Sequence, residues 1–311
     1  MILYRKSTTL TERNRSGMKR YFLILVLLLT LFTEISCTPR SVSNPESPQD
    51  SDAPCDENLL RFEERRYTYT GNEDDILIED DQLLIRRAGT YRLSGNLKEG
   101  AICVRVPQNE SVHLILEGIS IQSSYHAPLS IESAACVTLE LKEDSVNTFT
   151  DASRTKPREE DFLPLSCIEA YTSLLIQGNG TLIIRGRAET ALSCSESIRI
   201  NSGHITLSAP QIALWVRDRL QMHDGSLTVT SAQYGILVSQ EEKSAGVLEI
   251  SGGKLSMVCD KIALSAGTRI EISAGEGSLR APTLYQCEQK RQGDVRQGSI
   301  RITSPDFPPS T

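Results

Sequence analysis

Aromatic side chains are scarce in this 311-residue sequence. Phenylalanine, tyrosine and tryptophan together make up 5 % of the residues, and Trp215 is the single tryptophan. Hydrophobic residues nevertheless reach 39 %. Such a composition suits a narrow core filled by isoleucine, leucine and valine. The chain is long enough for one elongated domain whose core grows along a single axis.

Positive charge is also in short supply. The chain has 33 Lys and Arg against 40 Asp and Glu, for a net charge of −7. The first 36 residues hold six basic and two acidic side chains, so the remainder has 27 basic and 38 acidic ones and a net charge of −11. Because nucleic-acid recognition needs a basic surface, this balance argues against a DNA or RNA partner.

The apolar run near the N-terminus is too short to cross a membrane comfortably. It covers 12 residues, Tyr21–Phe32, and follows Lys19 and Arg20. A membrane-spanning helix needs about 20 apolar residues. A basic stretch before a run of this length is typical of a secretory signal peptide. We predict one over residues 1–36, with Met18 as the true start.

The segment "EISC" that follows resembles a bacterial lipobox. In such boxes the cysteine is lipidated and becomes the mature N-terminus, so the resemblance implies lipidation of Cys37. The alternative is an ordinary cleaved signal peptide that leaves a free thiol. Residues 37–55 are rich in proline, serine and acidic side chains, which predicts a flexible tether. We therefore expect a lipid-anchored protein of the bacterial cell envelope, at the outer membrane or the cell surface.

The histidines are not spaced like metal ligands, and the spacing of the cysteines does not dictate a set of disulfides. The four histidines show no such spacing: His113, His126, His204 and His223. Of these, His204 and His223 fall at strand turns or on the polar face, so we expect them at the surface. Seven cysteines remain after Cys37, and their spacing imposes no pairing. Cys194 falls in an apolar column, so we expect it to be a buried thiol.

What the chain does contain is one short unit repeated through Cys167–Ala281. The unit aligns at five starting residues: Leu174, Ile198, Leu220, Leu248 and Ile270. Apolar and polar residues alternate within it, which is the period of a strand with one buried face. Glycines such as Gly203 and Gly225 separate two strands in each unit. Repetition near this period is typical of a solenoid.

A third short strand precedes each pair. Its inward positions form two columns: Ile168, Leu192, Leu214 and Ile236, and then Ala170, Cys194, Val216 and Val238. Three short strands per coil without helical segments predict an all-β chain, a parallel β-helix. The L-x-x-L-x-L line of a leucine-rich repeat is absent.

The boundaries of this domain follow from the pattern. We predict a β-helix over residues 56–305 and a disordered tail at 306–311. Strands are expected from Ile76 onward, with an amphipathic segment at 56–70 covering the first coil. Two insertions are expected, at Ala152–Leu165 and Gln240–Gly246, and a last strand at Ser299–Ser304.

Several segments resemble a known family. "AGTYRLSG", "VHLILEGISIQSS" and "NTFTD", followed by repeated "L-x-I-x-G-x-G-x-L" coils, are similar to the bacterial carbohydrate-binding-domain family over about Ile76–Leu279. Its members are right-handed parallel β-helices that resemble polysaccharide lyases. They are exported, bind acidic plant polysaccharides such as pectins with calcium, and are not established catalysts. The resemblance implies the same handedness and a calcium-associated glycan partner here.

The family places acidic pairs ahead of its strands. At these positions the present sequence keeps carboxylates at Glu196 and Asp218 only. Calcium usually takes six to eight oxygen ligands, several of them from carboxylates. If calcium binds, these two residues are its expected ligands, and the site would be weak.

The sugar-binding candidates lie close to these acids. Trp215 sits between two inward columns and should point outward, where an exposed indole forms a stacking platform. We predict that Trp215, Tyr171, Arg199 and Arg217 together hold a sugar, with the arginine forks meeting a carboxylate. Two alternatives remain. Trp215 lies under a loop, or the arginines belong to a solvated charged turn.

We therefore expect an exported lipoprotein with a non-catalytic β-helix that binds an extracellular polysaccharide, with acidic sugars as the candidate ligands. No catalytic residue is assigned. One alternative is a divergent polysaccharide lyase. The other is a structural surface protein or adhesin whose strand faces meet another protein.

Overall fold

The computed structural model describes residues 58–64, 66–79, 82–152, 163–231, 233–238, 245–287 and 296–297. All of them lie in one structural unit, Pro54–Thr311. Several predicted segments lie outside the described residues: the signal peptide at 1–36, the tether at 37–55 with Cys37, most of both insertions, the strand Ser299–Ser304 and the tail at 306–311.

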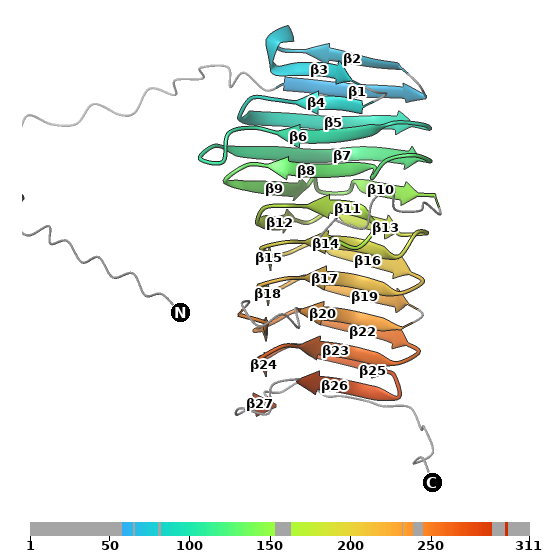
Figure 1. The fold of residues 1–311 in the computed structure, drawn as a ribbon, viewed down its shortest axis with the longest axis vertical. Coiled ribbons are helices and arrows are strands. Elements are labelled where there is room, and N and C mark those ends of the chain that lie inside the picture. Colours follow the sequence, from blue (N-terminus) through green and yellow to red (C-terminus); the bar gives the residue numbers. More distant parts are fainter. Residues whose placement is uncertain are drawn as a thin grey trace, which may run out of the picture. The chain divides into compact units, whose positions relative to one another are not determined.

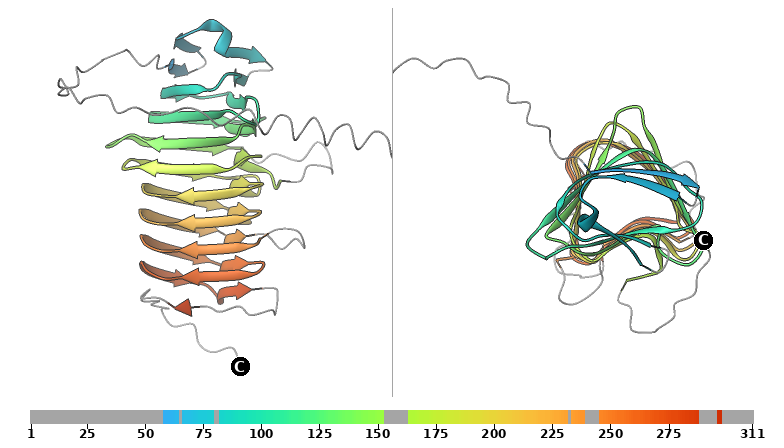
Figure 2. Two further views of the ribbon diagram at one scale, coloured as in Figure 1. Left: turned by 90° about the vertical axis from the view of Figure 1, so that its left-hand side faces the viewer. Right: turned by 90° about the horizontal axis from the view of Figure 1, so that it is seen from above.

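The described residues form a right-handed parallel β-helix with three short strands in most coils (Figure 1). Their one helical element is the 3-10 turn η1 (Glu73–Asp75). No helix within the described ranges is long and apolar enough to cross a membrane. Figure 2 shows the coils stacked one on another around a common interior.

One side of the β-helix is a ten-stranded sheet that begins with the antiparallel pair β3 and β4 and then takes one parallel strand from each later coil. Its strands are β3 (Ile76–Glu79), β4 (Gln82–Ile85), β6 (Ala101–Arg105), β8 (Leu129–Ser133), β11 (Ser166–Ala170), β14 (Thr190–Cys194), β17 (Ile212–Val216), β20 (Tyr234–Val238), β23 (Ile262–Ala266) and β26 (Thr283–Cys287).

The remaining strands form a 17-stranded sheet. They are β1 (Asn58–Glu64), β2 (Arg66–Thr70), β5 (Gly89–Leu97), β7 (Ser111–Ser123), β9 (Cys136–Leu141), β10 (Val146–Asp151), β12 (Leu174–Gly178), β13 (Thr181–Arg185), β15 (Ser197–Ile200), β16 (His204–Ala209), β18 (Arg219–Met222), β19 (Ser226–Ser231), β21 (Val247–Ile250), β22 (Lys254–Cys259), β24 (Arg269–Ile272), β25 (Glu276–Arg280) and β27 (Arg296–Gln297). From β9 onward each coil supplies two of them, paired in parallel with the same strands of the next coil.

The predicted register is confirmed residue by residue. The five aligned unit starts are direct neighbours on β12, β15, β18, β21 and β24: Leu174, Ile198, Leu220, Leu248 and Ile270. The first column of the short strand pairs as Ile168, Leu192, Leu214 and Ile236. These inward residues are all buried. The period-two pattern therefore identified the core face correctly.

The core also contains the predicted buried thiol. Cys194 is fully buried, and its Sγ donates a hydrogen bond to the carbonyl oxygen of Thr172 at 3.2 Å. Burial raises the pKa of Cys194 to about 12. The thiolate is the reactive form of cysteine, so this group is inert at neutral pH. Cys103 and Cys136 are free thiols like Cys194.

The N-terminal end differs from the prediction. Strands begin at Asn58 and not at Ile76, because β1 and β2 form an antiparallel hairpin and β1 pairs in parallel with β5. The first coil is therefore covered by a strand pair. In the first two coils the long strands β5 and β7 replace two short ones. Between the pairs Leu93–Leu116 and Gly95–Ile119, β7 has one residue more than β5, so the bulge lies in β7. Gly95 faces it in β5, where its φ is +94° and an added Cβ would lie 2.1 Å from the carbonyl oxygen of Phe62.

One buried polar side chain ties three coils together. Asn147, on β10, is fully buried. Its Oδ1 accepts hydrogen bonds from the amides of Gly118 and Ile119 at 2.9 and 3.1 Å. Its Nδ2 donates to Ser145 Oγ at 2.9 Å and to the carbonyl oxygen of Thr181 at 3.1 Å. The side chain thus supplies two acceptor contacts to β7 and one donor contact to β13.

Removing this link should destabilise the domain measurably. Asn147→Ala leaves two backbone amides at the bend of β7 without an acceptor, which we expect to lower the free energy of unfolding by about 2–4 kcal/mol. Urea denaturation followed by circular dichroism measures the change. Asn201→Ala, at an exposed position, is the matched control. Equal midpoints for the two variants would show that Asn147 does not support the fold.

Candidate functional site

The predicted sugar-binding residues lie on two neighbouring sides of the β-helix. Trp215 is on β17 in the ten-stranded sheet, and Arg199 is on β15 in the 17-stranded sheet. Tyr171 and Arg217 occupy the corner between the sheets, two coils apart in one column. Because neighbouring coils are about 4.8 Å apart, this column separates them by roughly 10 Å. The structure therefore aligns Tyr171 with Arg217 but places Arg199 around the corner.

Trp215 is less available than we predicted. Its flanking residues Leu214 and Val216 are buried, so its side chain points outward as expected. The indole itself is half-buried. Its column neighbours Ser193 and Leu237 are 0 % and 8 % exposed, so this part of the outer sheet face is largely covered. Part of the indole is left to contact a ligand.

The two acids at this corner are held by hydrogen bonds within the β-helix. Asp218 Oδ1 accepts from the amide of Ala245 at 2.9 Å, and Asp218 Oδ2 accepts from Ser197 Oγ at 3.3 Å. Glu196 Oε2 accepts from Ser173 Oγ at 2.7 Å. Each carboxylate thus has a structural role, joining its own coil to a neighbouring one.

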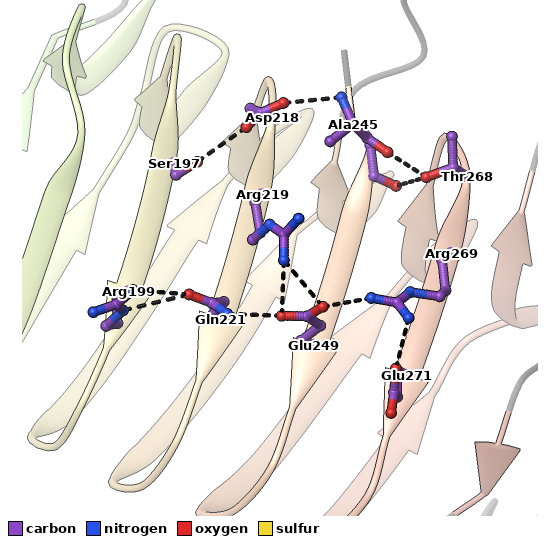
Figure 3. Close-up of polar contacts among 11 residues, drawn as sticks. Ser197, Arg199, Asp218, Arg219, Gln221, Ala245, Glu249, Thr268, Arg269 and Glu271 are labelled. Atoms are coloured by element: carbon purple, nitrogen blue, oxygen red, sulfur yellow. Dashed lines mark hydrogen bonds and ion pairs between the residues drawn. The ribbon is translucent and has the colours of Figure 1, made fainter.

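Beside this corner, polar side chains form a continuous chain across four coils (Figure 3). We call it the polar ladder, and it consists of Arg199, Arg219, Gln221, Glu249, Arg269 and Glu271. Its members point outward from β15, β18, β21 and β24. Because these strands are adjacent, the ladder runs along the axis of the β-helix.

The contacts of the polar ladder converge on Glu249. Gln221 Nε2 donates to its Oε2 at 2.7 Å, Arg219 Nη1 donates to its Oε1 at 3.2 Å, and Arg269 Nη2 donates to its Oε1 at 2.6 Å. Arg269 also pairs with Glu271, with Nη1 and Oε2 3.0 Å apart. At the other end, two nitrogens of Arg199 donate to Gln221 Oε1 at 3.3 Å.

These contacts set the charge of the polar ladder. Burial alone would raise the pKa of Glu249, but the amide of Gln221 and the guanidinium groups of Arg219 and Arg269 outweigh it and lower this pKa. Glu249 is therefore ionised at neutral pH. With three arginines and two glutamates, the polar ladder is a positive spot on an acidic chain.

A groove adjoins the polar ladder at the far end of the same strands. It has a volume of about 580 Å³ and follows the glycine turns between the second and third strands of successive coils. Polar side chains line it: Asn179, Ser202, His204, Asp224, Ser226, Lys254 and Glu276. His204 Nδ1 lies 2.9 Å from Ser226 Oγ in the next coil. The polar ladder and this groove make one polar surface that crosses several coils.

Comparison with known proteins identifies the family. The model of the carbohydrate-binding domain-containing proteins matches residues 79–303. The chain belongs to this family. A carbohydrate-binding domain-containing protein of Acetivibrio thermocellus is 30 % identical over 139 residues, which are 44 % of this chain and 49 % of that protein. The match thus spans about half the length of that relative.

A solved structure shows the same fold. The polysaccharide lyase-like protein from C. thermocellum, in a gadolinium derivative, superimposes with a TM-score of 0.71 and 24 % sequence identity. The match covers 79 % of this chain and 97 % of the other. The predicted family resemblance and the predicted fold are both confirmed.

Calcium, which the family resemblance implied, does not fit the acids of this carbohydrate-binding domain. Asp218 already uses both carboxylate oxygens, and Glu196 accepts from Ser173. Within the described ranges, no three or more His, Cys, Asp and Glu side chains gather where they could hold a metal ion. Calcium needs more free oxygen ligands than this corner offers.

Sequence reasoning missed four of the six residues of the polar ladder. It selected Arg199, but it overlooked Gln221, Glu249, Arg269 and Glu271. The signal was present, because Arg199, Gln221, Glu249 and Glu271 are the second residues of four consecutive aligned units. Aligned in this way, the outward column places a donor, an amide and two acceptors in successive coils.

Proposed function

We propose that this chain is an exported lipoprotein whose β-helix binds a polysaccharide, acidic in character, without cleaving it. Membership of the carbohydrate-binding family supports the class of ligand. The signal-like segment and the lipobox-like cysteine support export and anchoring. A lipid anchor followed by a flexible tether would hold the β-helix away from the membrane surface.

The observation that carries the proposal is the polar ladder. A polysaccharide presents hydroxyl groups that both donate and accept hydrogen bonds at regular intervals. The polar ladder offers donors and acceptors at the spacing of the coils, about 4.8 Å. Its side chains are held by one another, so little conformational entropy is lost when a ligand binds. Its excess of arginine suits a ligand that bears carboxylates.

The same contacts favour binding over catalysis. Glu249 is kept ionised by three neighbours, and both of its oxygens accept hydrogen bonds. Asp218 likewise uses both oxygens within the β-helix. General acid–base catalysis needs a group whose pKa lies near the working pH and that can reach the substrate. These carboxylates are arranged to position their neighbours.

Retention on immobilised glycans tests the function. We expect the purified protein to be retained on acidic polysaccharides more strongly than on neutral ones and to release no unsaturated products. Retention by affinity electrophoresis and ultraviolet absorbance of the products are measured on the same samples. Unsaturated products would identify a lyase instead. Absence of retention on every glycan would favour an adhesin.

Removal of calcium should not abolish binding. Because the acids at the corner are engaged within the β-helix, we expect EDTA to leave retention on an acidic polysaccharide unchanged within about twofold. The comparison uses matched columns with EDTA or with added calcium. Complete loss of retention in EDTA would restore a calcium-bridged mechanism.

Substitution of the lipobox-like cysteine tests the anchor. In cells fed a palmitate analogue, we expect the protein to be labelled and Cys37→Ser to abolish the label and release the protein from membranes. Cys55→Ser, at the nearest other cysteine, should keep the label. A Cys37→Ser protein that remains in the membrane fraction would show that Tyr21–Phe32 is retained as a membrane segment.

A further inference from the structure

A second cleft lies at the N-terminal end of the β-helix, apart from the polar ladder. It has a volume of about 490 Å³. The β1–β2 hairpin, β3, β4 and the turns that follow β5 and β7 supply its walls. The lining that matters for ligand chemistry is Phe62, Arg66, Tyr67, Ile78, Gln82 and Tyr125. Figure 1 places these elements at one end of the stack, while the polar ladder lies on β15 to β24 towards the other.

Two of the four exposed tyrosines in the described part of the chain line this cleft. Tyr125 is 79 % exposed and Tyr67 is 39 % exposed. Ile78, which is 48 % exposed, adds an aliphatic face. In a chain with 5 % aromatic residues, two exposed tyrosines in one cleft of ligand size are unusual. Exposed aromatic side chains with a polar tip are typical of binding surfaces.

The cleft is shaped in advance. Ser124, next to Tyr125, donates two hydrogen bonds to the carboxylate of Glu99, from its amide at 2.7 Å and from its Oγ at 2.8 Å. On the opposite wall, the rings of Phe62 and Tyr67 are in contact, with centroids 6.5 Å apart. Both tyrosines are therefore attached to fixed parts of the fold, and little ordering is needed when a ligand binds.

The polar groups of the cleft suit a sugar ring. Arg66 offers donors, and the Gln82 amide offers both a donor and an acceptor. A pyranose has an apolar face of C–H groups and a rim of hydroxyls that donate and accept. We propose that this cleft binds one pyranose unit, with its face on Tyr125 and its rim towards Gln82 and Arg66. The inference rests on the proposed function only for the kind of ligand.

Two separate subsites would change how the protein holds a polysaccharide. The cleft and the polar ladder are on different coils, so one long glycan, or two, can occupy both. Binding at one subsite raises the effective concentration at the other, and the combined affinity exceeds either alone.

Fluorine NMR of the full chain labelled with 3-fluorotyrosine tests the cleft directly. The Tyr125 resonance is assigned as the one that disappears in Tyr125→Phe. The probes are a neutral trisaccharide of glucose and trigalacturonate, which separate recognition of the ring from recognition of a carboxylate. We expect at least one of them to shift the Tyr125 resonance in a saturable manner and to leave that of Tyr285, a tyrosine at the other end, in place.

Matched variants measure the energetic contribution. Tyr125→Ala should weaken binding of the trisaccharide at this site by about tenfold, whereas Tyr125→Phe, which keeps the ring, should remain within about twofold. Tyr285→Ala is the control for loss of an exposed tyrosine. The two Tyr125 variants should keep the melting temperature of the parent, since Tyr125 is mostly exposed.

Three outcomes would overturn the inference in distinguishable ways. A Tyr125 resonance that ignores both trisaccharides, in a protein still retained on polysaccharide, refutes the cleft and leaves the proposed function intact. No response to either trisaccharide and no retention refutes both. A Tyr125 resonance that moves when residues 38–53 are deleted, but not with sugar, assigns the cleft to the N-terminal segment of the chain.

Discussion

Replacing Ile200 by aspartate should unfold the β-helix, whereas the same substitution at Asn201 should leave it folded. Ile200 is 2 % exposed and lies between Ile176 and Met222 of the neighbouring coils, both of which are buried. A carboxylate at this position would be buried without a partner, which costs several kcal/mol, about half of the stability of a typical domain. Asn201 is exposed at the turn after β15.

Circular dichroism and urea denaturation at neutral pH measure both variants. Ile200→Asp should lose its β-sheet signal or show a midpoint far below that of the parent. Lowering the pH should recover part of the loss, because a protonated carboxyl group is cheaper to bury than a charged one. Ile200→Val, which keeps an apolar side chain, is the control. Equal effects at positions 200 and 201 would refute the register of β15.

The inward face of the β-helix was predictable because each coil repeats the same physical constraint. An inward residue meets equivalent residues one coil above and one coil below, so apolar side chains recur at fixed spacing. The alignment of Leu174, Ile198 and Leu220 therefore gave the strand pairing directly. The buried state of Cys194 followed from the same column.

The N-terminal end could not be predicted in this way. It has no coil before it, so its strands do not repeat the pattern. The chain instead closes the end with the β1–β2 hairpin, which covers β5. The long strands β5 and β7 also lack the regular glycine turn, and their bends depend on Gly95 and on the buried Asn147.

The outward face was predictable only in part. The direction of Trp215 followed from its inward neighbours, but its burial depends on what covers the outer face of the ten-stranded sheet, which no local pattern encodes. The partners of Arg219 were missed for a related reason. A long side chain on one column can reach a carboxylate on the adjoining column of the next coil, as Arg219 does with Glu249. To predict such contacts from the sequence, several outward columns have to be aligned and compared together.

The polar ladder also differs from an ordinary set of surface ion pairs. Isolated exposed pairs contribute little to stability, about 0–1 kcal/mol each. Here the carboxylate of Glu249 accepts hydrogen bonds from two arginines and from the amide of Gln221, and the Glu249 side chain is 23 % exposed. A shared partner fixes several long side chains in one arrangement. The value of that arrangement therefore lies in presenting a defined polar surface more than in stabilising the fold.

Arg199 should be the most sensitive position on this surface. It ends the polar ladder, is exposed, and contacts Gln221 alone within the ladder, at 3.3 Å. Its guanidinium group can therefore turn to a ligand at little cost to its neighbours. We expect Arg199→Ala to weaken binding to an acidic polysaccharide at least about tenfold, or about 1.4 kcal/mol, with little change in melting temperature.

Matched variants separate the polar ladder from the side that bears Trp215. Arg185→Ala, at an exposed position on β13, removes the same charge away from the ladder and should leave the affinity within about twofold. Arg199→Lys keeps the charge but loses the planar fork, so it should recover only part of the affinity. Isothermal titration with an acidic oligosaccharide measures all of them together with Trp215→Ala and Arg217→Ala. If the last two variants alone lose affinity, the ligand lies at Trp215 and the corner, and the polar ladder is structural. If Arg199→Ala alone loses affinity, the ligand follows the polar ladder along the axis, and the half-buried indole serves packing.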